Sequence, residues 1–319
     1  MKLRTLGRTD IKISPIIMGT WQAGRDMWAD IDDAETTRAI QAALDAGVNT
    51  IDTAAVYGNG HSEKVVGRAV GARRPQVVIA TKVFADQLRY DQVIAACERS
   101  LKNLATDYID LYQIHWPSGA FGSPLVPIEE TMRALKVLKR QGKIRAIGVS
   151  NFSRKQLAEA IAFGAIESLQ PPYSLFWRQV EADAMPLCLE RGLSVLAYSP
   201  MAQGILAGRF GPEHQFKPGD HRRANRLLKR PLAKPVQQAL ADLRPLAEGN
   251  NLTLGQLALA WVIAQPGVCA IAGARNPRQA HENAAAGAVS LTPEDLAEMD
   301  RIGRQVTDQL DDNPVLWKW

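Results

Sequence analysis

The chain has 319 residues, of which 46% are hydrophobic and 22% are charged, so it can bury a full core. Its formal charge is only +5 and the basic residues are spread along the chain, which argues against nucleic acid as a partner. No apolar run approaches the roughly 18 residues that a membrane-spanning helix needs, and the N-terminus has no apolar signal-peptide core, so we expect a cytoplasmic protein without a membrane partner.

Short apolar segments alternate with amphipathic ones along most of the chain. Extended segments at residues 3–6 and 11–14 flank the turn sequence GRTD and predict a β-hairpin. Later apolar segments predict strands at 15–20, 48–52, 75–82, 107–115, 143–150, 167–170, 194–200 and 267–273. Amphipathic segments predict helices at 33–46, 61–71, 91–105, 127–143, 180–192, 236–247, 254–264, 276–286 and 292–303, and one more after Ser153. Residues 201–235 form a long basic insertion with neither pattern.

Residues with capping side chains stand at the start of several predicted helices. Asp33, Asp91, Ser153 and Thr292 are the expected N-caps, because their side-chain oxygens can accept from free amides of the first helical turn. Gly47 is suited to end the first helix.

The strand–helix unit recurs about eight times, at the spacing of βα units in a parallel sheet. Eight units closing on themselves give a (β/α)₈ TIM barrel. We expect one such domain over residues 1–319, with the hairpin at its N-terminus and an extra helix at its C-terminus. An open doubly wound sheet is the alternative, but Gly19-Thr20-Trp21 after the first strand does not supply the G-x-G-x-x-G turn that it would need.

Nearly every predicted strand ends on a polar or ionisable residue. In a barrel the carboxyl ends of the strands meet on one rim, where active sites lie. The residues placed there are Gly19, Thr20, Trp21, Asp52, Lys82, His115, Ser150, Asn151, Gln170, Tyr198, Ser199, Gly273 and Arg275. Together they predict a site at this rim.

Four of these groups suit a proton transfer. A buried strand that ends on Asp52 is costly unless that charge has a partner, and Lys82 can provide one. An ammonium favours the phenolate of a nearby tyrosine, so we expect Lys82 and Asp52 to make Tyr57 a general acid of lowered pKa. His115 can donate to a carbonyl oxygen and orient the substrate.

Other chemistries find little support in the sequence. The three cysteines, Cys97, Cys188 and Cys269, lie among apolar residues without metal-ligand spacing, so we expect buried free thiols and no metal site. A Ser-His-Asp arrangement is also missing from the pattern. Protonating a carbonyl oxygen requires a hydride for the carbon, which no side chain supplies, and this implies a nicotinamide cofactor.

At this point the chain resembles a known family. The motifs NTIDTAAVYG, VVIATK, SLKNLATDYIDLYQIHWP, GKIRAIGVSNF, LQPPYSLFWR and VLAYSPMAQGILAGR follow one another between Leu3 and Asn283 as in the aldo-keto reductase superfamily, nearest to the bacterial branch that also resembles potassium-channel β subunits. The resemblance implies a barrel whose bottom is plugged by the hairpin. It also implies that Asp52, Tyr57, Lys82 and His115 form a catalytic tetrad that reduces an aldehyde or ketone to an alcohol, or catalyses the reverse reaction.

The same resemblance implies NADPH or NADP⁺ as cofactor. Its expected contacts are Gly19, Thr20, Trp21 and Asp52; Ser150, Asn151 and Gln170 at the carboxamide; Tyr198 on the nicotinamide ring; Ser199, Pro200, Met201, Ala202, Gly204 and Arg209 along the pyrophosphate; and Gly273, Arg275, Gln279, Glu282 and Asn283 at the adenosine end. Arg275, Arg278, Arg209 and the pair Arg222-Arg223 offer charge for a 2′-phosphate, although the pair could equally lie in a solvated loop.

Several questions stay open at this stage. Trp21, Trp28 and Trp116 suggest an apolar pocket for a small carbonyl or alcohol substrate, and Trp317 and Trp319 could close over it or pack on the barrel. A redox-sensing or regulatory protein with secondary catalysis is the alternative function, and a Schiff-base enzyme that uses Lys82 is a third. The sequence does not identify the substrate, the direction of the reaction or the oligomeric state.

Overall fold

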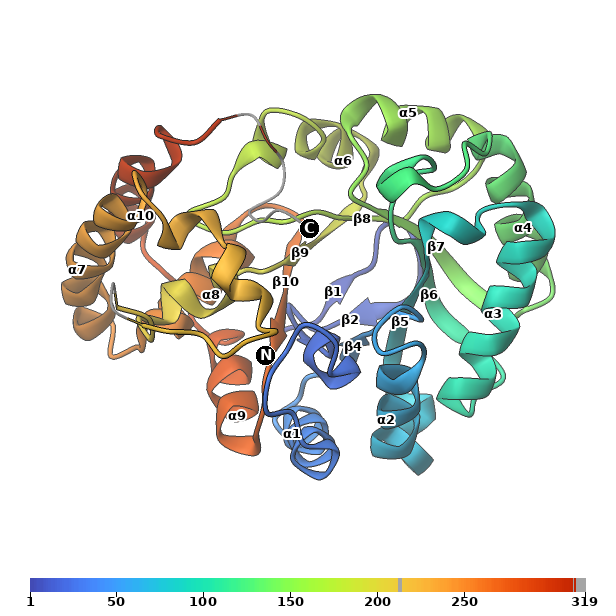
Figure 1. Ribbon diagram of the computed structural model, residues 1–319, viewed down its shortest axis with the longest axis horizontal. Helices are drawn as coiled ribbons and strands as arrows, with labels where there is room; N and C mark the ends of the chain where they lie inside the picture. Colours follow the sequence, from blue (N-terminus) through green and yellow to red (C-terminus); the bar gives the residue numbers. More distant parts are fainter. Residues whose placement is uncertain (212–213, 312, 314–319) are drawn as a thin grey trace.

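The computed structural model describes residues 1–211, 214–311 and 313. Eight parallel strands close into a barrel in the order β10-β3-β4-β5-β6-β7-β8-β9 (Figure 1). Their bounds are β3 Ile16–Gly19, β4 Thr50–Asp52, β5 Val78–Val83, β6 Ile109–Ile114, β7 Ile144–Ser150, β8 Ser168–Gln170, β9 Ser194–Tyr198 and β10 Val268–Gly273. The predicted TIM barrel is confirmed, and all eight predicted strands are present, each of them shorter than expected.

Helices surround the barrel on the outside (Figure 1). They are α1 Asp33–Asp45, α2 His61–Val70, α3 Tyr90–Leu104, α4 Ile128–Arg140, α5 Arg154–Phe163, α6 Met185–Arg191, α7 Ala233–Gly249, α8 Leu254–Ala264, α9 Pro277–Ala286 and α10 Pro293–Thr307. The extra helix α10 packs against α7, which in turn contacts α8. None of the helices in the described part of the chain has the length and apolar character needed to cross a bilayer.

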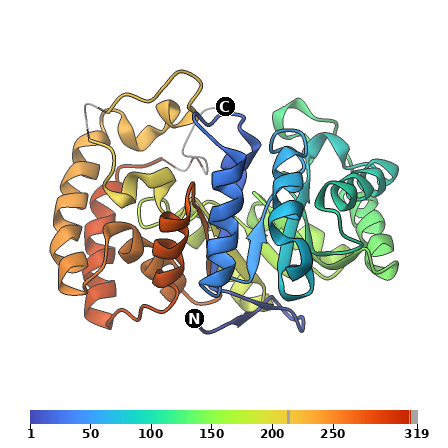
Figure 2. The same cartoon turned by 90° about the horizontal axis from the view of Figure 1, so that it is seen from below.

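The N-terminal hairpin covers the lower end of the barrel, opposite the strand ends that bear the predicted site (Figure 2). Its strands are β1 Arg4–Thr5 and β2 Lys12–Ile13, paired antiparallel. Leu6, Ile11 and Ile13 are buried in a cluster of apolar side chains that includes Leu111 of β6. Burial of these side chains holds the hairpin in place as a plug.

A second and larger apolar cluster lies between the barrel wall and the helices. Alternate side chains of a strand point to opposite faces, so most of the strands contribute to both clusters. In β6, for example, Leu111 belongs to the inner cluster and Tyr112 to the outer one. The cysteines Cys97, Cys188 and Cys269 are buried free thiols, as predicted.

Two of the four predicted N-caps are wrong. Asp32, and not Asp33, caps α1, since its side chain accepts from the Glu35 amide. Helix α3 begins at Tyr90, which puts Asp91 inside the first turn. The other two caps, Ser153 and Thr292, are confirmed by bonds to the third helical amide.

The insertion at residues 201–235 is more ordered than its sequence indicates. It contains the short 3₁₀ helices Ala202–Ala207, His221–Ala224 and Arg226–Leu228, and the beginning of α7. The predicted helix 236–247 is therefore too short, because Pro235 lies in the first turn of α7, where proline is tolerated. The predicted helix 180–192 is too long, since α6 begins only at Met185.

Candidate active site

A cavity of about 710 Å³ opens at the carboxyl ends of the strands. The proposed tetrad members Asp52, Tyr57 and His115 line it, whereas Lys82 is fully buried behind them. Of the nineteen expected cofactor contacts, all line this cavity except Ala202, which is buried in the surrounding core; of the arginines expected to offer further charge, Arg222 lines it too. The strand-end residues of eight separate elements therefore come together in one place, as the barrel pattern predicts.

Lys82 makes the central contacts of the tetrad. Its Nζ donates to Asp52 Oδ1 at 2.6 Å and to the Thr53 carbonyl at 2.8 Å, and it lies 3.5 Å from Tyr57 Oη. The rings of Tyr57 and His115 are perpendicular, with centroids 5.7 Å apart. The ammonium is thus in contact with a carboxylate and a phenol at once.

Strand register brings these groups together. Asp52 of β4 is paired with Ala80 of β5, so Lys82, two residues further along, points to the same side as Ala80. His115 directly follows β6, the next strand in the barrel, and its amide donates to Val83 O of β5 at 2.9 Å. A one-residue slip of β5 would turn Lys82 outward.

Two glycines position the loop that carries Tyr57. A Cβ on Gly24 would lie 2.7 Å from the carbonyl carbon of Tyr57, and a Cβ on Gly58 would meet the Gly24 carbonyl oxygen. Gly58 also has a φ of +61°, which side chains disfavour. The loop bearing Tyr57 therefore packs backbone to backbone on the loop after β3.

Asp52 has further partners that sequence reasoning missed. Its Oδ2 accepts from Gln170 Nε2 at 2.8 Å and from Gln113 Nε2 at 3.4 Å. Gln113 is fully buried in β6. A polar side chain in a buried strand, two residues before His115, was the available signal for it.

Burial decides the protonation of the site. It raises the pKa of Tyr57 well above the usual value, and the Asp52 charge adds to this, so the expectation that Lys82 lowers that pKa is wrong. Burial lowers the pKa of Lys82, while Asp52 opposes the change. Burial and the Lys82 charge hold the pKa of His115 well below its usual value. At neutral pH Tyr57 is a protonated phenol and His115 a neutral imidazole, and both can donate.

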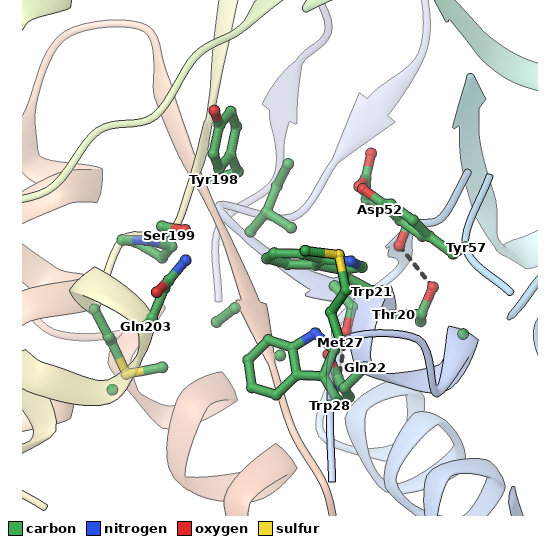
Figure 3. A pocket seen from close by; sticks show the side chains of 18 of the residues that line it. Thr20, Trp21, Gln22, Met27, Trp28, Asp52, Tyr57, Tyr198, Ser199 and Gln203 are labelled. Carbon is green, nitrogen blue, oxygen red and sulfur yellow. Dashed lines mark hydrogen bonds between the residues drawn. The ribbon is translucent and has the colours of Figure 1, made fainter. Parts of the chain in front are cut away.

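Asn151 connects two parts of the rim. Its Nδ2 donates to the His115 carbonyl at 3.0 Å, and its Oδ1 accepts from Tyr198 Oη at 2.9 Å. The residue has a φ of +61°, a conformation that costs free energy and often marks functional sites. Figure 3 shows Tyr198 and Ser199 on one wall of the cavity, opposite Asp52 and Tyr57.

The far end of the cavity is basic. Arg209, Arg222 and Arg275 line it, and Arg275 Nη2 is buried without a hydrogen-bond partner in the described structure. Burial lowers the pKa of Arg275, and the charge of Arg222 lowers it further. An orphaned guanidinium nitrogen among like charges fits an anionic group such as a phosphate.

Two other arginines do not reach this end of the cavity. The Arg278 side chain is 75% exposed and pairs with Glu282, so its predicted role at a phosphate is not supported. Arg222 lines both the main cavity and a smaller one and pairs with Asp220, whereas Arg223 lines only the smaller one. Of this pair, Arg222 is therefore placed to offer charge to a phosphate in the main cavity, whereas Arg223 is not.

Aromatic side chains surround the tetrad. Trp21 lies edge-on to Trp28, with centroids 5.4 Å apart (Figure 3). On another side, Phe121 stacks on Phe84 at 5.7 Å and meets Trp116 edge-on at 5.0 Å. These residues confirm the predicted apolar lining of the pocket around the tetrad.

Two further expectations concern the tail and metals. Trp317 and Trp319 lie outside the described residues. Within the described ranges, no group of three or more His, Cys, Asp or Glu side chains is placed to hold a metal ion.

Comparison with curated proteins finds close relatives along nearly the whole chain. Aldo-keto reductase YhdN of Bacillus subtilis is 37% identical over 95% of this chain and 93% of its own length. The NADH-specific methylglyoxal reductase of Escherichia coli is 35% identical over 94% of this chain and 97% of its own length. A probable voltage-gated potassium channel β subunit of Arabidopsis thaliana is 32% identical over 95% of this chain and 96% of its own length.

Solved structures agree with the fold. The glycerol dehydrogenase AKR11B4 of Gluconobacter oxydans superposes with a TM-score of 0.88 at 35% identity, over 97% of each chain. An aldo/keto reductase of Klebsiella pneumoniae, in complex with NADP and acetate, superposes with a TM-score of 0.73 at 34% identity, over 91% of this chain and 92% of that one. The Aldo/keto reductase family model matches residues 15–304. Barrel, site and relatives together show that this chain belongs to the aldo/keto reductase family.

Proposed function

We propose that the protein is an NADPH-dependent oxidoreductase that reduces an aldehyde or ketone to an alcohol, or catalyses the reverse, with Tyr57 as general acid and base. The observation that carries the proposal is the contact of Lys82 Nζ with both Asp52 and Tyr57 at the cavity. All of this chemistry would reside in one domain over residues 1–319. Mixing the protein with NADPH and a panel of aldehydes, and following the absorbance of the reduced nicotinamide, tests it.

The side chains have distinct tasks in this scheme. Bound NADPH would supply the hydride for the carbonyl carbon. Tyr57 Oη gives its proton to the carbonyl oxygen as negative charge develops there, and the adjacent Lys82 ammonium stabilises the resulting phenolate. The neutral His115 donates a hydrogen bond to the same oxygen and orients the substrate. Asp52 holds Lys82 in place and charged.

The basic end of the cavity supports NADPH over NADH. Arg275, with its orphaned Nη2, would hold the 2′-phosphate, and Arg209 and Arg222 line the same end. The nicotinamide end would lie near Tyr198 and Asn151, beside the tetrad. Since one relative is described as NADH-specific, the preference depends on this chain's own arginines.

Arg275→Ala should weaken NADPH binding roughly 10- to 100-fold, the value of a charged hydrogen bond or two, and change NADH binding by less than about threefold. Isothermal titration with each cofactor measures both. Arg278→Ala is the matched control, because that side chain is exposed outside the cavity. Equal losses for NADPH and NADH in Arg275→Ala would remove the phosphate assignment.

The aromatic surround of the tetrad favours an uncharged substrate with an apolar or aryl group next to its carbonyl. Phe121→Ala should lower kcat/KM for an aryl aldehyde about 10- to 100-fold, because 1–3 kcal/mol of apolar contact is lost, and should change methylglyoxal turnover much less. Leu125→Ala is the control, since this residue of the same loop is 83% exposed and does not line the cavity. Equal losses on both substrates would contradict a role in selection.

A regulatory, redox-sensing function is the second candidate, and the similarity to a potassium channel β subunit favours it. Tight NADPH binding with no turnover on any aldehyde or ketone in the panel would support this candidate. A Schiff-base role for Lys82 finds little support, because the amine is fully buried and is held by Asp52 and the Thr53 carbonyl.

A further inference from the structure

Glu63 is a buried carboxylate that the scheme above does not use. It lies in the first turn of α2 and is fully buried, yet in the described structure it forms no ion pair within 4.0 Å. Its Oε1 accepts from Thr81 Oγ1 at 2.7 Å, and its Oε2 accepts from Asn103 Nδ2 at 2.9 Å. Burying a charge with only neutral partners is costly, which calls for a function that justifies it.

The partner on β5 points to that function. Thr81 directly precedes Lys82, and consecutive strand residues face opposite sides of the sheet. Lys82 points into the barrel toward Asp52, whereas Thr81 points outward to Glu63 on α2. The strand that carries Lys82 therefore has a buried carboxylate on each of its faces, Asp52 inside the barrel and Glu63 outside it.

The same end of α2 also holds Tyr57. The Ser62 amide donates to the Tyr57 carbonyl at 3.2 Å. The Ser62 hydroxyl bonds to the Thr20 carbonyl and contacts Thr53 Oγ1, both at 2.9 Å. Glu63 and its neighbour Ser62 thus connect both the loop of Tyr57 and the strand of Lys82 to one helix terminus.

We propose that Glu63 is a positioning residue of the active site: from outside the barrel wall it fixes the strand that carries Lys82, and its charge acts through that wall on the ammonium. The assignment rests on the proposed reductase function. Asp52 supplies the direct contact with the amine, and Glu63 adds a second negative charge that leaves the cavity side free for the substrate.

The charged and titratable groups around Glu63 agree with this role. Burial lowers the pKa of Lys82, and the Asp52 and Glu63 charges both oppose that change. On the outer side, Cys97 of α3 and Tyr112 of β6 are buried groups with raised pKa values, so both stay neutral. Tyr57 and His115 face Lys82 from the cavity. Lys82 is consequently the cation on which the Glu63 charge acts.

The test is the dependence of kcat on pH in Glu63→Gln, measured with saturating NADPH and the best aldehyde. Loss of a negative charge lowers the pKa of both the Lys82 ammonium and the Tyr57 phenol, so each loses its proton at lower pH. The alkaline limb of the curve of kcat against pH should therefore shift to lower pH by about 0.5–1 pH unit. KM for NADPH should not change. An alkaline limb at the wild-type pH overturns the proposal.

Two further variants separate charge from structure. Glu167→Gln removes another buried carboxylate, which accepts from the Arg8 amide near the hairpin, and should leave the alkaline limb in place. Thr81→Val keeps the Glu63 charge but removes its bond to β5, and should lower kcat roughly tenfold through misplacement of Lys82, without moving the limb. Wild-type kcat in Thr81→Val overturns the positioning role, and this variant decides the matter if Glu63→Gln does not fold.

These outcomes are distinguishable from failure of the reductase assignment. A Tyr57→Phe variant that retains turnover would remove the proposed acid itself. An inactive Tyr57→Phe together with an unshifted Glu63→Gln profile would remove only the role of Glu63.

Discussion

Tyr57→Phe should lower kcat by on the order of 10³-fold while NADPH still binds with near wild-type affinity. The substitution removes only the hydroxyl that lies 3.5 Å from Lys82 Nζ and leaves the ring packed against His115. Without that hydroxyl, none of the other groups that contact Lys82 in the described structure, the Asp52 carboxylate and the Thr53 carbonyl, can give a proton to a carbonyl oxygen. Stopped-flow measurement of cofactor oxidation, with fluorescence titration of NADPH, gives both quantities.

The control for Tyr57→Phe is Tyr108→Phe, which removes a phenol outside the cavity, where the ring stacks against Arg74. This control should keep wild-type kcat. If Tyr57→Phe turned over its best aldehyde at the wild-type rate, another residue would have to be the acid.

Lys82→Met should have the second large effect, because it breaks a buried ion pair and removes the charge that stabilises the phenolate. Among the described residues, Asp52 would then be buried with only Gln170 and Gln113 as side-chain partners. Breaking such a pair typically costs about 3–5 kcal/mol in the free energy of unfolding. The rate per folded molecule should fall a further 10²- to 10³-fold or so. Urea unfolding and kcat of the folded fraction measure the two losses separately.

A matched variant is Arg74→Met, since Arg74 pairs with the buried Asp110 away from the cavity. It should also lose stability, although less than Lys82→Met because Asp110 still pairs with Arg145, and it should keep its rate per folded molecule. A Lys82→Met protein that is destabilised but fully active would show that the pair serves folding alone.

Sequence periodicity predicted the convergence of the tetrad because a parallel barrel leaves little freedom in where a strand ends and to which side its residues point. Once β4 and β5 are adjacent and both end on the same rim, alternation determines that Asp52 and Lys82 point to the same side. Tyr57 was harder to place, because its position depends on a loop. The close approach of Gly24 and Gly58 that holds this loop involves residues 34 positions apart and leaves no periodic pattern.

The errors have a common physical origin in irregular segments and in burial. The positions of Ala202 behind the cavity wall and of Arg278 in solvent follow from a 3₁₀ turn and a helix orientation that spacing along the chain does not determine. The pKa of Tyr57 depends on how much protein covers the hydroxyl, and burial raises that pKa together with the Asp52 charge. The sequence alone predicts which groups meet, but not how strongly each is desolvated.

The backbone contact between Gly24 and Gly58 has a consequence for how this catalyst can diversify. Any side chain at either glycine displaces the phenol, so these two loops must change in concert or stay as they are. In the loop between β6 and α4, His115 packs against the Tyr57 ring, but the part around Phe121 has no such backbone contact with the loop of Tyr57 in the described structure. Directed evolution toward new carbonyl compounds should therefore accumulate its productive substitutions in that loop, and should find almost none at the paired glycines.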